Sequence, residues 1–262
     1  MDENNKKLTT KQLIIIASAV LAILLIVLLI IFIPKCKPDN GGNPGGQSSP
    51  GGSDQVTPGK GLILELSSDG EYYIVTDTTS DYLTSAIIPE TYYGLPVKEI
   101  GREAFYGCCD LVSIEIPDSV ETIKYGAFYR CQSLKSIVIP NSVTTMGNSI
   151  FEECISLESV TLSNSLTSLG SRVFFKCEKL TNVIIPNGIQ EIDQECFYQC
   201  TLLSSVVIPT SVTQISGYVF DSCTSLANIY YRGTETQWGE INKASSWDSN
   251  AGSYNISYNY AG

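Results

Sequence analysis

The sequence predicts a solenoid of short repeats, with a parallel β-sheet on one face, short helical or 3₁₀ turns on the other, and one transmembrane helix ahead of it. The first observation behind this prediction is a pattern of side chains that returns every 23 residues across residues 89–232. The second is a change of apolar spacing inside each repeat. The third is an uncharged apolar stretch near the first residue.

The 23-residue period rests on columns of identical or similar residues. Phenylalanine returns six times without an exception, cysteine follows each phenylalanine by three residues, and leucine follows each cysteine by three more. A fixed period of this length is typical of stacked repeats, in which each unit is one layer. The two strictest columns are Phe105, Phe128, Phe151, Phe174, Phe197 and Phe220, and Cys108, Cys131, Cys154, Cys177, Cys200 and Cys223.

The spacing of apolar residues within one repeat predicts its local structure. From Ala127, apolar residues fall at i, i+1, i+4 and i+7, which indicates one face of a short helix or 3₁₀ turn. Ile137 and Ile139 then alternate with their neighbours, as in a half-buried strand. Pro140 ends that strand, because proline has no N–H to donate to a sheet.

These residues follow the pattern L-x-x-I-x-I-P-x-S-V-x-x-I-x-x-x-A-F-x-x-C-x-x-L, which resembles the BspA-like leucine-rich repeat. The resemblance implies a concave sheet built by the Ile-x-Ile strands and an opposite wall built by the A-F-x-x-C turns. It also implies a place on a cell surface and a role in adhesion. The pattern is interrupted at Ser163, which replaces proline, and at Tyr231 and Arg232, where Ile-Pro is expected.

The stretch from Leu13 to Ile33 holds 21 residues and no charged side chain. At about 1.5 Å per residue, a helix of this length crosses a hydrocarbon core about 30 Å thick. A cleaved signal peptide is the alternative, but its apolar region is usually about 7–15 residues long and ends in small residues. Pro34 and Lys35 follow here, which favours an uncleaved anchor and disfavours lipidation at Cys36.

Charge sets the predicted orientation and limits the partners. Three lysines precede the span and two follow it, so the positive-inside rule places residues 1–12 in the cytoplasm and the repeats outside the cell membrane. Of 16 basic and 27 acidic residues, three and two lie before residue 35, which leaves a net charge of −12 beyond it. An acidic domain of this kind does not attract nucleic acid.

The rest of the chain divides by composition. Residues 34–60 are rich in glycine, proline and serine and are predicted to form a flexible linker. Residues 61–88 are predicted to form a β-hairpin that caps the first repeat, and residues 89–232 to form six repeat turns. Residues 233–262 break the period and are predicted to form the second cap, with Trp238 in its core.

The residues available for chemistry predict a protein that is not an enzyme. The chain has no histidine, which excludes Ser-His-Asp and Cys-His catalysis and imidazole metal ligands. It has no glycine-rich phosphate loop either, so no cofactor and no metal are predicted. Glu191, Asp193 and Glu195 could in principle bind calcium, but they lack the EF-hand pattern and are expected to be solvated carboxylates.

Nine cysteines in an exported chain usually indicate disulfides. The six column cysteines, however, occupy the same inward position of successive layers, where parallel side chains fit disulfide geometry badly. We therefore expect buried thiols in this column. Cys109 and Cys196 lie outside it and are the expected pairing or reactive thiols.

The outward positions of the predicted strands form the candidate binding site. Since alternate strand residues face opposite ways, two columns are expected to point outward on the sheet. One is polar and the other is unusually apolar for a solvent-facing strip, which often marks an interaction surface. The alternative is a row of β-branched residues favoured by sheet packing alone. The predicted ligand-binding residues are Val138, Thr161, Ile184, Val207, Tyr230, Ser136, Asn182 and Asn228.

Together these features predict a membrane-tethered, extracellular domain that recognises proteins on a host, a neighbouring cell or the matrix without covalent chemistry. Adhesion itself is implied by the resemblance rather than by the columns. The alternative is a structural component of the cell envelope that binds wall polymers or sister proteins. A third hypothesis, an enzyme or enzyme regulator, has the least support, since no convergent polar cluster accompanies the missing histidine.

Overall fold

The computed structural model describes residues 59–80 and 82–262, all within the second of two units, Asp39–Gly262. The predicted transmembrane span and the first 25 residues of the predicted linker, 34–58, lie outside the described residues. Within the described residues, no helix has both the length and the apolar character needed to cross a membrane.

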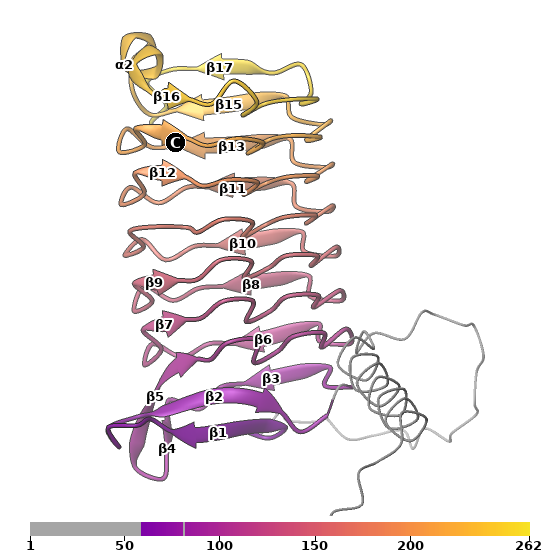
Figure 1. Cartoon of the computed structure of the whole chain (residues 1–262), viewed down its shortest axis with the longest axis vertical. Coiled ribbons are helices and arrows are strands. Elements are labelled where there is room, and N and C mark those ends of the chain that lie inside the picture. The colour runs from indigo at the N-terminus through magenta and orange to yellow at the C-terminus, as the bar shows by residue number, and fades with distance from the viewer. Residues whose placement is uncertain (1–58, 81) are drawn as a thin grey trace, which may run out of the picture. The chain divides into compact units, whose positions relative to one another are not determined.

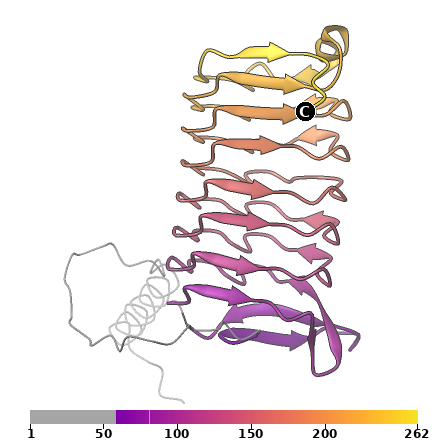
Figure 2. The same ribbon diagram turned by 180° about the vertical axis from the view of Figure 1, so that it is seen from behind.

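One strand of each repeat contributes to a parallel ladder along one side of the solenoid, here called the strand face (Figures 1 and 2). Hydrogen-bonded pairing runs β3–β6, β8–β10 and β11–β13–β15–β17, and the register repeats once per layer. The predicted solenoid with a parallel sheet on one face is therefore confirmed. The strands are β3 (Ser85–Ile87), β6 (Ser113–Glu115), β8 (Ser136–Val138), β10 (Ser159–Thr161), β11 (Asn182–Ile184), β13 (Ser205–Ile208), β15 (Asn228–Tyr231) and β17 (Asn255–Ser257).

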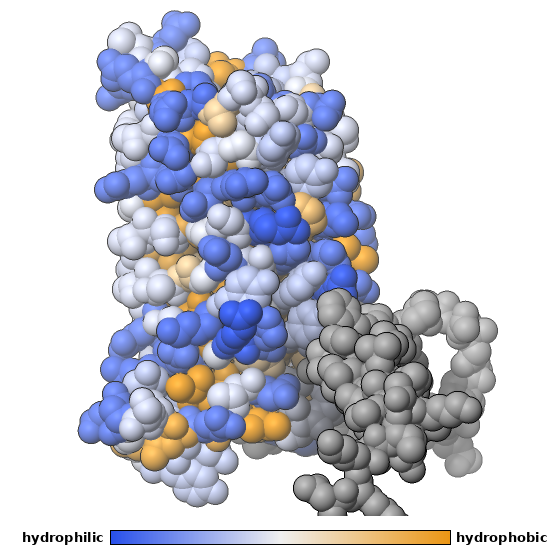
Figure 3. Space-filling model, in the orientation of Figure 1, coloured by the Kyte–Doolittle hydropathy of each residue, from blue (hydrophilic) through white to orange (hydrophobic). Residues whose placement is uncertain are grey.

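The opposite side, here called the turn face, carries a second set of short parallel strands that the spacing of apolar residues did not predict. They pair as β5–β7–β9 and β12–β14–β16. In the space-filling view this face is mostly hydrophilic (Figure 3). The strands are β5 (Leu95–Ile100), β7 (Thr122–Ile123), β9 (Thr145–Met146), β12 (Glu191–Ile192), β14 (Gln214–Ile215) and β16 (Asn242–Lys243).

The A-F-x-x-C stretches form hydrogen-bonded turns with the bond pattern of a 3₁₀ turn, so of the two predicted alternatives the turn is right and the short helix is wrong. The Cys131 N–H donates to the Phe128 carbonyl three residues earlier, at 3.1 Å, as in a 3₁₀ turn. The N–H groups of Phe128 and Arg130, however, donate to carbonyls of the next repeat at 3.0 and 2.8 Å. Arg130 also has a positive φ of 62°. A helix cannot continue when alternate N–H groups bond between layers.

The core is a stack of identical side chains. Each phenylalanine ring of the column lies 5.2–5.6 Å from the next, with interplanar angles of 8–17°. Trp247 closes the stack edge-on against Phe220, at 5.8 Å between centroids. Every phenylalanine of the column is fully buried. Because no layer could bury both faces of its ring alone, the stack makes each repeat depend on its neighbours.

The column cysteines form hydrogen bonds between layers, a role that the small size of their side chains did not suggest. In five of the six layers the cysteine Sγ donates to a phenylalanine carbonyl of the preceding layer, at 3.0–3.2 Å. Cys131, Cys154, Cys177, Cys200 and Cys223 are buried free thiols, as expected, and Cys108 is buried in the same column. Cys109 is disulfide-bonded, which agrees with its expected pairing. Cys196 is instead a free thiol that is fully buried, so the expectation of a pairing or reactive thiol is wrong at this position.

Both ends of the repeat array are covered. At one end, β1 (Leu62–Leu66) and β2 (Tyr73–Thr78) form an antiparallel hairpin, and β2 pairs in parallel with β5, while β4 (Thr91–Tyr92) pairs antiparallel with β5. At the other end, α2 (Glu235–Glu240) begins with a capping box at Thr234. Trp238 of this helix is buried and contacts the Tyr231 and Trp247 rings edge-on.

Candidate binding surface on the strand face

The strand face presents two apolar side chains to solvent. Val138 is 61% exposed and Ile184 is 56% exposed, whereas the residues before them, Ile137 and Val183, are buried. This alternation follows from the two-residue period of a strand, since Ile137 and Val183 fill the core. The two exposed side chains occupy the same strand position in different layers, and Thr161 occupies it in the layer between them.

The polar column lies beside this apolar one. Ser136 and Asn182 are exposed, and Asn182 donates from Nδ2 to the Thr181 hydroxyl at 3.1 Å. The structure therefore brings five of the eight predicted site residues together on open surface: Ser136, Val138, Thr161, Asn182 and Ile184.

The other three predicted site residues are covered or partly covered. Val207 is only 7% exposed, and Asn228 and Tyr230 are half-buried. The cause is the segment after β17, which returns in front of the strand face (Figure 2). Tyr260 of this segment stacks on Tyr230 at 4.5 Å and donates its N–H to the Tyr231 carbonyl at 3.1 Å.

A pocket of about 350 Å³ adjoins the open part of the strand face. Thr161, Asn182 and Ile184 line it, together with Asn187 and Arg232. Arg232 Nη1 donates to Asn187 Oδ1 at 2.9 Å, and none of the lining residues is acidic. Arg232 was visible in the sequence only as a departure from Ile-Pro. Its guanidinium and the neighbouring amides are groups that recognise carboxylates and backbone carbonyls.

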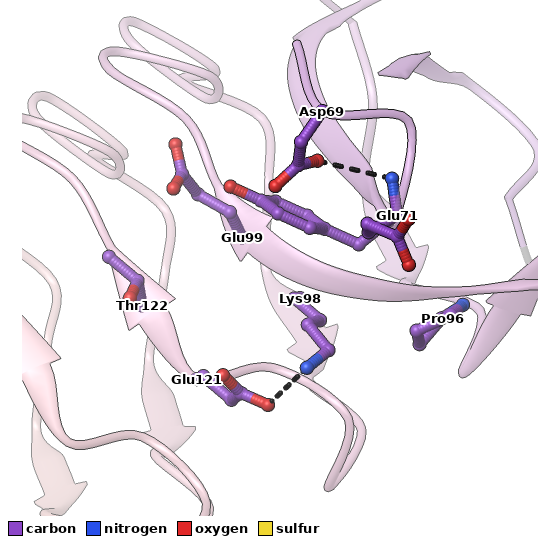
Figure 4. Close-up of a pocket in the computed structure, with 8 residues that line it drawn as sticks. Asp69, Glu71, Pro96, Lys98, Glu99, Glu121 and Thr122 are labelled. Carbon is purple, nitrogen blue, oxygen red and sulfur yellow. Dashed lines mark hydrogen bonds and ion pairs between the residues drawn. The ribbon is translucent and has the colours of Figure 1, made fainter. Parts of the chain in front are cut away.

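A larger pocket of about 460 Å³ lies on the turn-face side of the first cap and is acidic (Figure 4). Its charges are largely satisfied within the chain. Lys98 pairs with Glu121 at 2.8 Å, and Asp69 accepts hydrogen bonds from the Ser67 hydroxyl and the Glu71 N–H. These hydrogen bonds, that of Ser67 first, lower the pKa of Asp69. No group of three or more metal-binding side chains is present among residues 59–80 and 82–262.

The acidic residues considered for calcium have separate partners. Glu191 accepts from the Gln214 amide and the Ser216 hydroxyl, both at 2.7 Å. Glu195 pairs with Arg172. Burial, with a smaller contribution from Glu191, raises the pKa of Asp193. The three carboxylates therefore do not form one ligand set.

Fold and surface together define a parallel β-solenoid of the leucine-rich-repeat class. The chain belongs to the BspA type Leucine rich repeat region family, which it matches in six copies over residues 98–229. It is similar to the T. pallidum Leucine Rich Repeat protein (TpLRR), with 32% identity, a TM-score of 0.63, and coverage of 67% of this chain and 81% of that one.

A second similar structure is a leucine-rich repeat protein from Eubacterium ventriosum. It has 24% identity and a TM-score of 0.57, and the match covers 71% of this chain and 51% of that one, so it supports the fold alone. No curated protein matches the chain.

Proposed function

We propose that this protein recognises another protein noncovalently through the open part of the strand face. The observation that carries the proposal is the exposure of Val138 and Ile184 at the same strand position of different layers, each directly after a buried core residue. Covering these two side chains would stabilise a complex by about 1–2 kcal/mol each. The ladder already holds them in place, so little conformational entropy is lost on binding.

We also propose that the repeat domain lies outside the cell, with the stretch from Leu13 to Ile33 as an uncleaved anchor and residues 1–12 in the cytoplasm. Adhesion to host, neighbouring cells or matrix is the use that fits such a surface best. An epitope tag ahead of Met1 should stay on the full-length chain in the membrane pellet after alkaline extraction. Protease added to intact cells should remove the repeat domain and leave the tag. Loss of the tag from the mature chain would contradict the anchor.

The strand-face proposal is tested by capture with the immobilised full chain. Solubilised host-surface, matrix and own-envelope proteins are passed over it, and bound protein is titrated to saturation. A chain carrying Val138→Asp and Ile184→Asp should lose at least about tenfold in affinity, because two buried carboxylates in the interface would lack partners. Leu202→Asp is the matched control, since Leu202 is 51% exposed but lies outside the two strand columns.

Two outcomes would count against recognition of foreign proteins. Capture that is equal in the double variant and the Leu202→Asp control would exclude the strand face as the binding surface. Capture restricted to proteins or wall polymers of the same envelope would favour a structural role in the cell envelope. Each variant should first keep the unfolding transition of the unmodified chain, so that lost capture reports the surface and not the fold.

A further inference from the structure

A second column of the repeat, on the turn face, departs from its pattern in two layers. The residue after each core phenylalanine is aromatic in four layers, and these rings meet in pairs: Tyr106 is tilted against Tyr129 at 5.2 Å, and Phe175 stacks on Tyr198 at 4.9 Å. In the other two layers the residue is a carboxylate, Glu152 or Asp221. The stack of rings therefore has two gaps, each with a carboxylate in place of a ring.

The chain fills the first gap with its own guanidinium. Arg172 donates from Nε and Nη2 to the two Glu152 carboxylate oxygens, at 3.1 and 2.6 Å. Its Cζ lies 3.7 Å from the centroid of the Phe175 ring. Nη1 of the same guanidinium also binds Glu195. One planar cation thus replaces the missing ring, because it both stacks on an aromatic face and neutralises the carboxylate.

The second gap, at Asp221, is a pocket of about 320 Å³ lined by Phe175, Glu195, Tyr198, Tyr218 and Asp221. None of these five lining residues is basic. Asp221 is 7% exposed, and its Oδ1 accepts hydrogen bonds from the Ser222 hydroxyl at 2.6 Å and the Asn250 amide at 3.5 Å. Within the described part of the chain, Oδ2 of Asp221 has no hydrogen-bond donor.

From this repetition we infer that the Asp221 pocket binds the guanidinium of an arginine side chain presented by a partner protein. Asp221 accepts from the guanidinium through Oδ2, and Tyr198 contacts its flat face, as Glu152 and Phe175 do for Arg172. Glu195 also lines the pocket, but Arg172 already neutralises its charge, so Asp221 is the carboxylate left for the ligand. This site lies on the turn face and is independent of the proposed recognition by the strand face.

The charge of the pocket selects a cation over a neutral ring. A sugar could stack on Tyr198, but it would cover a mostly buried carboxylate without neutralising it, which is costly. A guanidinium can donate an N–H to Asp221 Oδ2 while its plane lies flat on an aromatic ring, whereas an ammonium does only one of these at a time. Arginine should therefore bind more tightly than lysine.

The probe is N-acetyl-arginine amide, titrated against the full chain and observed by saturation-transfer NMR of the ligand. N-acetyl-citrulline amide is the neutral analogue of the same shape, and methyl glucoside tests the sugar alternative. Arginine binding should be saturable and at least about tenfold tighter than citrulline binding, the size expected for loss of one charge-assisted contact. Equal binding of arginine and citrulline, or tighter binding of methyl glucoside, would overturn the inference.

Two variants place the binding at the pocket. Asp221→Asn keeps Oδ1 for Ser222 and Asn250, so it should fold normally, yet it should weaken arginine binding about tenfold. Tyr198→Leu should weaken it about threefold by removing the ring face. Asp118→Asn, which removes an exposed charge elsewhere, is the matched control and should bind like the unmodified chain. If Asp221→Asn binds arginine as well as this control does, the inference is wrong.

Discussion

At Gly188 a single backbone contact overrides the repeat pattern. Serine occupies this repeat position at Ser119, Ser142, Ser165 and Ser211, so a consensus argument would favour Gly188→Ser. A β-carbon at Gly188, however, would lie 2.2 Å from the Leu166 carbonyl oxygen. We expect Gly188→Ser to lower the free energy of unfolding by about 2–3 kcal/mol, since the backbone of an adjacent layer must move.

Urea titration followed by circular dichroism measures this loss. Ser142→Gly is the reciprocal control at the same repeat position. It should cost only about 1 kcal/mol, through the greater freedom of glycine in the unfolded chain. A Gly188→Ser protein as stable as the unmodified one would show that the two layers can separate without cost at this point.

The cysteine column gives a second prediction for individual residues. Buried Sγ atoms that donate to carbonyls at 3.0–3.2 Å should remain thiols in a protein purified from an oxidising compartment. A thiol reagent added to denatured, unreduced protein should detect at least six thiols: Cys131, Cys154, Cys177, Cys196, Cys200 and Cys223. Fewer than six would mean that some of these buried thiols are oxidised, and fewer than five would require oxidation within the column itself.

At the scale of elements, the sequence predicted the strand face better than the turn face. The alternation of apolar and outward-facing residues around Ile137 and Ile139 indicates one structure, a strand with one buried side. The spacing from Ala127 is equally compatible with a helix and with a turn, because both bring i and i+3 together. The choice between helix and turn depends on the N–H groups of Phe128 and Arg130, which donate to carbonyls of the next layer. A pattern within one repeat carries no information about that pairing.

The segment after β17 provides the prediction at this scale. Tyr260→Ala removes the ring that stacks on Tyr230 at 4.5 Å. The unfolding free energy should fall by about 1 kcal/mol, the usual worth of an aromatic pair. Amide exchange should quicken in β15 and in β13, which pairs with it, and not in β8, which pairs with β10 instead. Equal acceleration in β8 would mean that the effect is global and that the segment is not a local cover.

At the scale of the whole molecule, open surface could be predicted only where one repeat resembles the next. Val138 and Ile184 are exposed because their layers follow the pattern. Val207 is buried because a segment more than 50 residues later in the chain folds back over Tyr230 beside it. The Asp221 pocket was likewise invisible to the period, since it arises where the aromatic column is interrupted. Interruptions of the repeat, rather than the repeat itself, thus distinguish one face of this solenoid from another.

The stacked thiols also make the stability of the whole domain depend on pH. Burial raises the pKa of Cys131, Cys177, Cys196 and Cys200, and raises that of Cys223 to about 12. In the unfolded chain each thiol ionises near pH 8.5. Above that pH the unfolded state has lost protons that the folded state keeps, so the free energy of unfolding falls as pH rises. Each thiol lowers the free energy of unfolding progressively between about pH 8.5 and its folded-state pKa, and it has no such effect below about pH 8.5.

Each such thiol contributes a slope of up to about 1.4 kcal/mol per pH unit. Urea unfolding under reducing conditions at pH 7, 9 and 10 measures the total slope. Replacing Cys177 and Cys200 together by alanine should reduce the slope between pH 9 and 10 by about 2–3 kcal/mol per pH unit, while tyrosines and lysines contribute equally to both proteins. The replacement also lowers stability at pH 7, because two S–H donors and their packing are lost, so the two curves should converge as pH rises. Parallel curves would mean that the column thiols ionise as readily in the fold as in the unfolded chain, which a fully buried ladder does not allow.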